Sequence, residues 1–196
     1  MRRGTATYEE FLKVPPEKVA EILDGELIVS PRPAPPHASA AFGLGVDLAV
    51  FDQQRRRSPD DPGGWCILPE PELHFARSGI PEIVVPDLAG WLVERMPTLP
   101  GTAFFDLRPD WICEILSPST AVIDHTRKRR IYAAAHVKHL WFLDPLAQIL
   151  DVYRLEGERY ALLASHAEAE RVRAEPFEQV ELDLTRWWPP PGSPGR

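Results

Sequence analysis

The sequence predicts a mixed α/β fold, in which a β-sheet packs against helices, with an N-terminal β-hairpin and C-terminal antiparallel strands. Short β-prone runs alternate with two segments of helical apolar spacing. Residues 111–143 read as strand, helix and strand, which is a right-handed crossover if the two strands are parallel. Sheets of this kind place functional sites at the carboxyl ends of their strands.

The N-terminal elements follow from turn residues and apolar spacing. A short helix over residues 8–13 ends before Pro15-Pro16. Apolar runs at 19–23 and 26–30 flank Asp24-Gly25, a pair suited to a two-residue type I′ hairpin turn. A longer helix is predicted from His37 to about Arg57, where arginines at its end would complement the helix dipole.

The rest of the chain reads as strands around a second helix. That helix covers Asp124 to about Ala135, with Asp124 as a natural N-cap. Strands are predicted at residues 65–68, 72–75, 83–92, 111–116 and 139–143, then as a hairpin at 149–155 and 159–164. Residues 171–174 and 180–184 are predicted as edge strands.

Length and composition favour one domain over residues 1–187, followed by a disordered, proline- and glycine-rich tail at 188–196. The chain lacks a run of 18 apolar residues and an apolar signal block, which predicts no membrane span and a cytoplasmic location. Cys66 and Cys113 are far apart in the sequence, so we expect reduced thiols.

The net charge of -7 argues against a protein that coats nucleic acid by bulk electrostatics. Positive charge is nevertheless concentrated at residues 55–57 and 127–130. These clusters could contact phosphates, although charge alone favours solvated helix ends or faces.

Glu114 is the most informative residue, because it lies in an apolar strand beside Ile112, Ile115 and Leu116. An ionised carboxylate there needs a cation, a metal ion or hydrogen bonds. Lys128, four residues beyond Asp124, lies roughly 6 Å along the predicted helix and could reach back. Asp87 and Glu114 could hold Mg²⁺, while a nearby lysine could orient its water or stabilise a phosphate. That combination points to phosphodiester hydrolysis.

Val85-Pro86-Asp87, Glu114 in ICEILSPST, Asp124 and Lys128 in DHTRKRRIYAAA, and the segment HLWFLDP resemble the bacterial restriction-endonuclease family Uma-two, within the PD-(D/E)xK nuclease superfamily. The resemblance implies a restriction-endonuclease-like fold, with a mixed β-sheet flanked by helices. It also implies a nuclease that acts on DNA with Mg²⁺ or Mn²⁺ as its cofactor. It implies that Asp87, Glu114 and the backbone carbonyl of Ile115 are metal ligands. Lys128 would be the motif lysine, and Glu21 an additional acid at the rim of the site.

Two positions depart from the family pattern. Leu116 stands where the superfamily has its lysine, so activity depends on Lys128 from the next helix. His136 replaces a glycine after that helix, and we expect it to adopt the positive φ of a helix end.

Several alternatives remain open. Asp87 could cap a local turn, Glu114 and Lys128 could form a structural ion pair, and Glu21 could face solvent. His37, at a helix start, is more often structural or exposed than catalytic. The whole chain could be a non-catalytic binding or dimerisation module with a remnant metal site. If it cuts both DNA strands, one small domain needs two sites, which predicts a two-fold homodimer.

Overall fold

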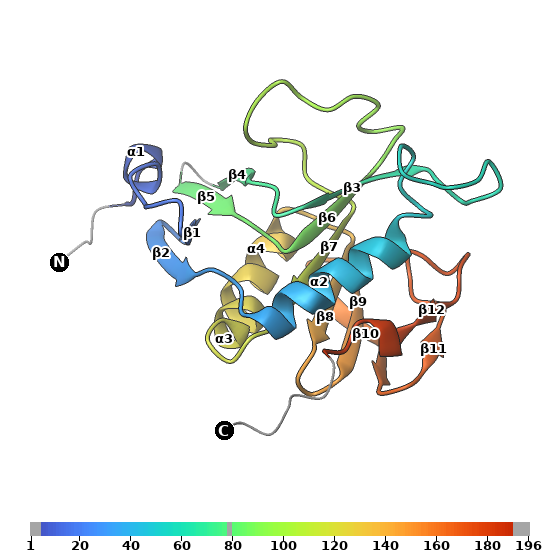
Figure 1. The fold of residues 1–196 in the computed structure, drawn as a ribbon. Helices are drawn as coiled ribbons and strands as arrows, with labels where there is room; N and C mark the ends of the chain where they lie inside the picture. The colour runs from blue at the N-terminus through green and yellow to red at the C-terminus, as the bar shows by residue number, and fades with distance from the viewer. Residues whose placement is uncertain (1–4, 78–79, 190–196) are drawn as a thin grey trace.

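A six-stranded sheet forms the centre of the computed structural model, which describes residues 5–77 and 80–189 (Figure 1). Its strand order is β10-β9-β8-β7-β6-β3. Strands β7 and β8 are parallel, and every other neighbouring pair is antiparallel. The predicted crossover is therefore confirmed. The bounds are β3 (Trp65–Pro69), β6 (Leu88–Leu92), β7 (Trp111–Ile115), β8 (His139–Asp144), β9 (Ile149–Glu156) and β10 (Arg159–Ala167).

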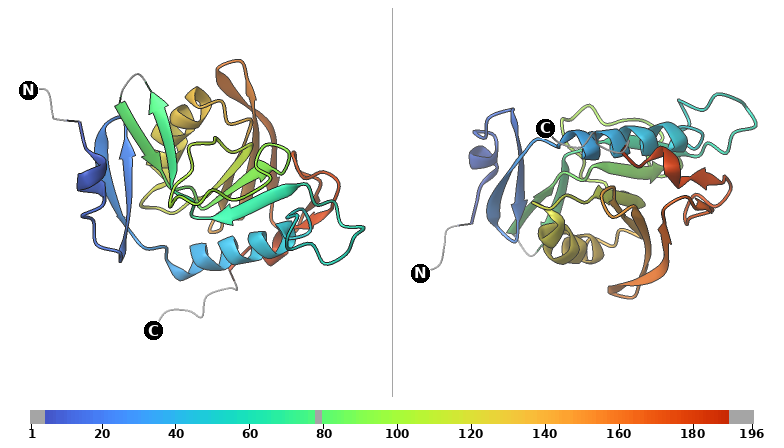
Figure 2. Two further views of the ribbon diagram at one scale, coloured as in Figure 1. Left: turned by 90° about the horizontal axis from the view of Figure 1, so that it is seen from above. Right: turned by 60° about the horizontal axis from the view of Figure 1, so that its bottom comes forward.

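Helices cover both faces of this sheet (Figure 2). Helix α2 (Pro35–Leu48) lies on one face, and the continuous helical segment α3 (Ala121–Ile123), η1 (Asp124–Lys128) and α4 (Arg129–Ala134) lies on the other. The side chains of strand β7 point alternately toward the two faces of the sheet. Trp111, Cys113 and Ile115 pack into the core under α2, while Ile112 packs into the core under α4. Because side chains alternate along a strand, Glu114 faces the helix that carries Lys128.

A second, four-stranded sheet has the order β2-β1-β5-β4. It contains the hairpin of β1 (Lys18–Leu23) and β2 (Glu26–Pro31), together with β4 (Leu73–Arg77) and β5 (Ile80–Val84). Asp24 and Gly25 have φ values of 52° and 75°. Positive φ at both central residues is what a type I′ turn requires, so the predicted hairpin is confirmed. The short helix α1 (Tyr8–Phe11) was also predicted.

The predicted single strand at 83–92 is wrong, because the chain leaves one sheet and enters the other within it. Strand β5 ends at Val84 and β6 begins at Leu88. Pro86, between them, has no N–H to donate to a sheet. The break puts Asp87 at the junction of the two sheets, directly before β6.

Two helix predictions also need correction. The second helix begins at Ala121, so Asp124 lies inside it and is not its N-cap. Helix α2 ends at Leu48, so residues 55–57 lie beyond it and do not complement its dipole. His136 has φ of 58° directly after the second helix, as expected.

The C-terminal strands form but do not join the main sheet. Strands β11 (Arg171–Val172) and β12 (Leu182–Asp183) make a separate two-stranded sheet, followed by the short helix η2 (Leu184–Arg186). Most of the predicted tail, residues 190–196, lies outside the described residues. Both cysteines are free thiols, as predicted. Within the described ranges, no helix is long and apolar enough to cross a bilayer.

Candidate active site

A cavity of about 280 Å³ opens beside the end of β7 and gathers all the predicted site residues. Glu21 reaches it from β1, Asp87 from the junction before β6, Glu114 and Ile115 from β7, and Lys128 from η1. His37, near the start of α2, and Asp124 also line it. Residues separated by more than 100 positions in the sequence therefore share one cavity.

Lys128 is a buried cation among three carboxylates. Its Nζ lies 2.7 Å from Glu114 Oε1, 3.1 Å from Glu21 Oε1 and 3.6 Å from Asp124 Oδ1. Burial alone would lower the pKa of this ammonium, but the carboxylates of Glu114 and Glu21 outweigh burial and hold the pKa well above its usual range. Lys128 is therefore charged at neutral pH.

The acidic side chains around Lys128 outnumber this single cation. Glu114 is 2% exposed, and burial raises its pKa well above the usual range. Lys128 opposes this rise, while Asp124, Asp87 and Glu21 add to it. Burial also raises the pKa of Asp124. An additional cation in this cavity would therefore relieve electrostatic repulsion.

Asp87 is fixed by contacts from both sides of the site. Its Oδ2 accepts a hydrogen bond of 2.6 Å from the Ile115 N–H, and its Oδ1 lies 3.1 Å from His37 Nε2. The carboxylate thus joins β7 to α2 and does not merely cap a local turn. His37 Nδ1 is buried and has no hydrogen-bond partner in the described part of the chain.

The helix opposite β7 supplies a second fixed contact for Glu114. Tyr132 donates a hydrogen bond from its hydroxyl to Glu114 Oε1. Asp124, Lys128 and Tyr132 recur every four residues, which puts them on neighbouring turns of one helix face. Asp124–Lys128 forms a π-helical turn, a local widening often found at functional sites.

The donor chemistry fits a hard divalent cation. Asp87, Glu114 and the Ile115 carbonyl offer oxygen atoms, which Mg²⁺ prefers, and Mg²⁺ usually keeps several waters as well. Across residues 5–77 and 80–189, no group of three or more His, Cys, Asp or Glu side chains is arranged as a metal centre. An ion held here would therefore need water or substrate oxygens to complete its shell.

Two of these residues were not identified from the sequence. Tyr132 could have been found from its spacing of four residues from Lys128, whereas nothing in the sequence pairs His37 with Asp87. The sequence favoured a structural or exposed His37 over a catalytic one, and the side chain is 12% exposed and contacts Asp87. The solvent-facing alternative for Glu21 is wrong, because this residue is 8% exposed and ion-paired with Lys128.

Comparisons with known proteins identify the family and support the fold. Residues 8–185 match the sequence profile of a family described as Uma2, putative restriction endonuclease. The crystal structure of a putative nuclease belonging to DUF820 from Anabaena variabilis is similar, with a TM-score of 0.70 and 25% sequence identity. That similarity covers 93% of this chain and 97% of the other. No curated protein matches the chain.

Proposed function

The chain belongs to the Uma2 family of putative restriction endonucleases, and from this membership we propose that it is a Mg²⁺-dependent endonuclease that hydrolyses phosphodiester bonds of DNA. The convergence of Asp87, Glu114 and Lys128 in one acidic cavity carries the proposal. A charged lysine beside surplus carboxylates suits a site that holds a metal ion together with a phosphate.

Each residue has a distinct task in the proposed site. Asp87, Glu114 and the Ile115 carbonyl would hold Mg²⁺ or Mn²⁺. When bound, such an ion acts as a Lewis acid and lowers the pKa of a coordinated water. Hydrogen bonds from Ile115 and His37 orient Asp87. Lys128 would stabilise the charge that builds on the phosphate.

Glu21 takes a supporting part. Its carboxylate lies 3.1 Å from Lys128 Nζ, so it helps to keep the ammonium charged and in place. Glu21 also contacts the chain before Asp87, because its Oε1 accepts a hydrogen bond of 2.9 Å from the Val85 N–H.

We further propose that the protein acts as a two-fold homodimer on DNA in the cytoplasm, because cutting both strands needs two sites. Residues 1–187 would form its single domain.

A non-catalytic binding or dimerisation module is the second candidate. One observation favours it: Glu114 Oε1 already contacts both Lys128 and Tyr132, as in a structural ion-pair network. The net charge of -7 also weakens general affinity for DNA. In that case the acidic cavity would serve stability.

Cleavage of supercoiled plasmid separates the two candidates. With Mg²⁺ or Mn²⁺ the wild type should produce nicked and linear DNA, while EDTA or Asp87→Asn should abolish the products. An RNA transcript tested in parallel tells DNA from RNA as substrate. Absence of metal-dependent products from both nucleic acids would reject the nuclease and leave the binding module.

A further inference from the structure

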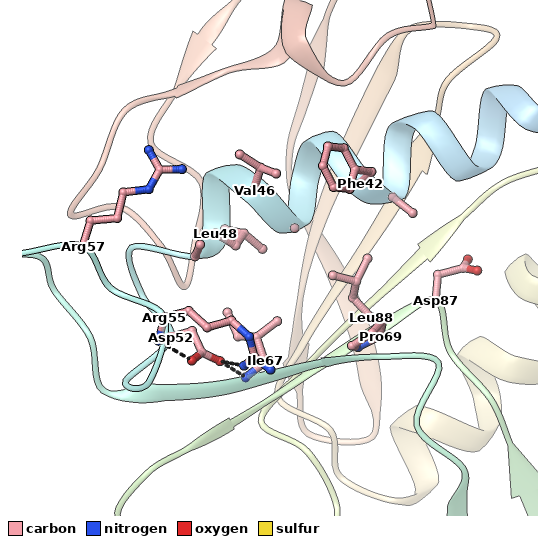
Figure 3. A pocket seen from close by; sticks show the side chains of 13 residues that line it. Phe42, Val46, Leu48, Asp52, Arg55, Arg57, Ile67, Pro69, Asp87 and Leu88 are labelled. Atoms are coloured by element: carbon pink, nitrogen blue, oxygen red, sulfur yellow. Dashed lines mark hydrogen bonds and ion pairs between the residues drawn. The ribbon is translucent and has the colours of Figure 1, made fainter.

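A second and larger cavity, of about 520 Å³, lies between α2 and the strands β3 and β6 (Figure 3). Its volume is in the range of small-molecule sites, about 300–1,000 Å³. Asp87 stands at one end of it, and Arg55 and Arg57 stand at the other. The wall between them is mostly apolar and is formed by Phe42, Val46, Leu48, Ile67, Pro69 and Leu88. We call this cavity the α2 groove.

We propose that the α2 groove receives a base of the nucleic-acid substrate next to the phosphate that is cut. Phe42 would provide a stacking surface, and Arg55 and Arg57 would contact neighbouring phosphates. This inference rests on the proposed function, since it places the substrate of the same site.

The α2 groove adjoins the candidate active site at Asp87. Asp87 lines both the 280 Å³ cavity and the α2 groove. A nucleotide held in the groove would therefore lie beside a carboxylate proposed to hold the metal ion. This position suits the nucleotide next to the phosphate that is cut. An unrelated small molecule would gain nothing from lying beside this carboxylate, so it is a less suitable occupant of the groove.

Phe42 places an exposed aromatic ring at the edge of the groove. This side chain is 76% exposed on α2, although a large apolar residue normally gains by burial. An exposed aromatic ring next to a groove is a common stacking platform for unpaired bases. Every base has a flat face, so such a contact needs no particular base sequence.

Two arginines, Arg55 and Arg57, line the far end of the groove together with Asp52. Arg55 Nη1 lies 2.9 Å from Asp52 Oδ2, and Asp52 is 2% exposed. The Asp52 carboxylate also accepts hydrogen bonds from the backbone N–H groups of Gln54, Arg55 and Ile67, so it is rigidly held. The Arg55 side chain is still 55% exposed. A braced but accessible guanidinium is suited to a phosphate.

The test uses a single-stranded oligodeoxynucleotide with 2-aminopurine, a base whose fluorescence falls when it stacks on an aromatic ring. Binding is measured in EDTA, so that no cleavage occurs. Phe42→Ala should weaken binding about tenfold or more and remove the fluorescence change. Leu146→Ala is the matched control, because Leu146 is also exposed, at 61%, but lies in the turn after β8.

The arginines are tested through the salt dependence of binding. Arg55→Ala and Arg57→Ala should each reduce the slope of log K against log salt by about 1. Lys13→Ala, in the turn after α1, where the side chain is 69% exposed, should leave the slope unchanged.

Three results would overturn the inference. One is an absence of oligonucleotide binding by the wild type. Another is unchanged binding and fluorescence in Phe42→Ala. The third is conversion of a dimer to a monomer by Phe42→Ala, since the groove would then be covered by a second copy of the chain. If the plasmid is still cleaved in these cases, the proposed function stands and only the groove inference fails. Phe42-dependent binding without any cleavage would show that the groove binds a base, but it would reject the nuclease and with it the placement beside a cut phosphate.

Discussion

Replacing the buried Lys128 by methionine tests the electrostatic account of the site. Methionine is close in length to lysine but carries no charge, so Lys128→Met leaves Glu21, Glu114 and Asp124 without their cation. These residues are 8%, 2% and 4% exposed. Removing one partner from a buried ion pair costs about 3–5 kcal/mol. For a chain of this length, that corresponds to a fall of roughly 6–20 °C in unfolding temperature.

The loss should depend on pH in a defined direction. Burial raises the pKa of Glu114 in the folded protein well above its usual 4.5. As the pH falls from this raised pKa toward the pKa of the unfolded state, the folded protein binds the proton more readily, and this protonation stabilises the fold. Lys128 opposes that rise, and its removal lifts the pKa further. The pKa of Lys128 is itself raised, so its contribution is complete at pH 8 and is lost only above its usual 10.5. We therefore expect a large loss at pH 8 that shrinks toward pH 5.

Circular dichroism melting curves at both pH values measure this effect. Lys13→Met is the control, because Lys13 is 69% exposed and forms a surface ion pair with Glu9, so its loss should shift the unfolding temperature by no more than about 2 °C. Equal stability of Lys128→Met and wild type at pH 8 would show that the buried carboxylates do not need this cation. A loss of equal size at both pH values would contradict the expected pH dependence.

Three further variants test the contacts of the two carboxylates. Asp87→Asn can still accept the Ile115 hydrogen bond, so it should fold but lose Mn²⁺ binding in titration calorimetry; retained affinity would remove Asp87 from the ligand set. His37→Ala should weaken Mn²⁺ binding about 10–100-fold, with partial rescue by His37→Gln, and unchanged affinity would make the residue purely structural. Tyr132→Phe removes the donor to Glu114 and should cost about 1–3 kcal/mol in urea unfolding, whereas an unchanged midpoint would argue that the bond contributes nothing.

Local signals in the sequence predicted the elements whose structure is set locally. Asp24-Gly25 predicted the hairpin through its positive φ values, and the parallel crossover followed from strand, helix and strand order. Glu114 was informative because a carboxylate in an apolar strand needs compensation, and Lys128 provides it. These features depend on residues that lie within about thirty positions of one another in the sequence.

Features that depend on distant contacts were missed. Strand β5 belongs to the second sheet because it pairs with β1, about 60 residues earlier in the sequence, through Ile22 and Ile83. The contact of His37 with Asp87 joins residues 50 positions apart and has no sequence signal of its own. Asp124 looked like a helix cap because aspartate is common there, yet burial beside Lys128 determines its place inside the helix.

A crystal structure of the protein soaked with Mn²⁺ would show whether the acidic cavity binds a metal ion, since anomalous scattering locates the ion. We expect one strong peak in the 280 Å³ cavity, in bonding contact with carboxylate oxygens of both Asp87 and Glu114. A soaked crystal with no peak there, and with Lys128 still bound to Glu114, would contradict the claim that this cavity is a metal-dependent hydrolytic centre.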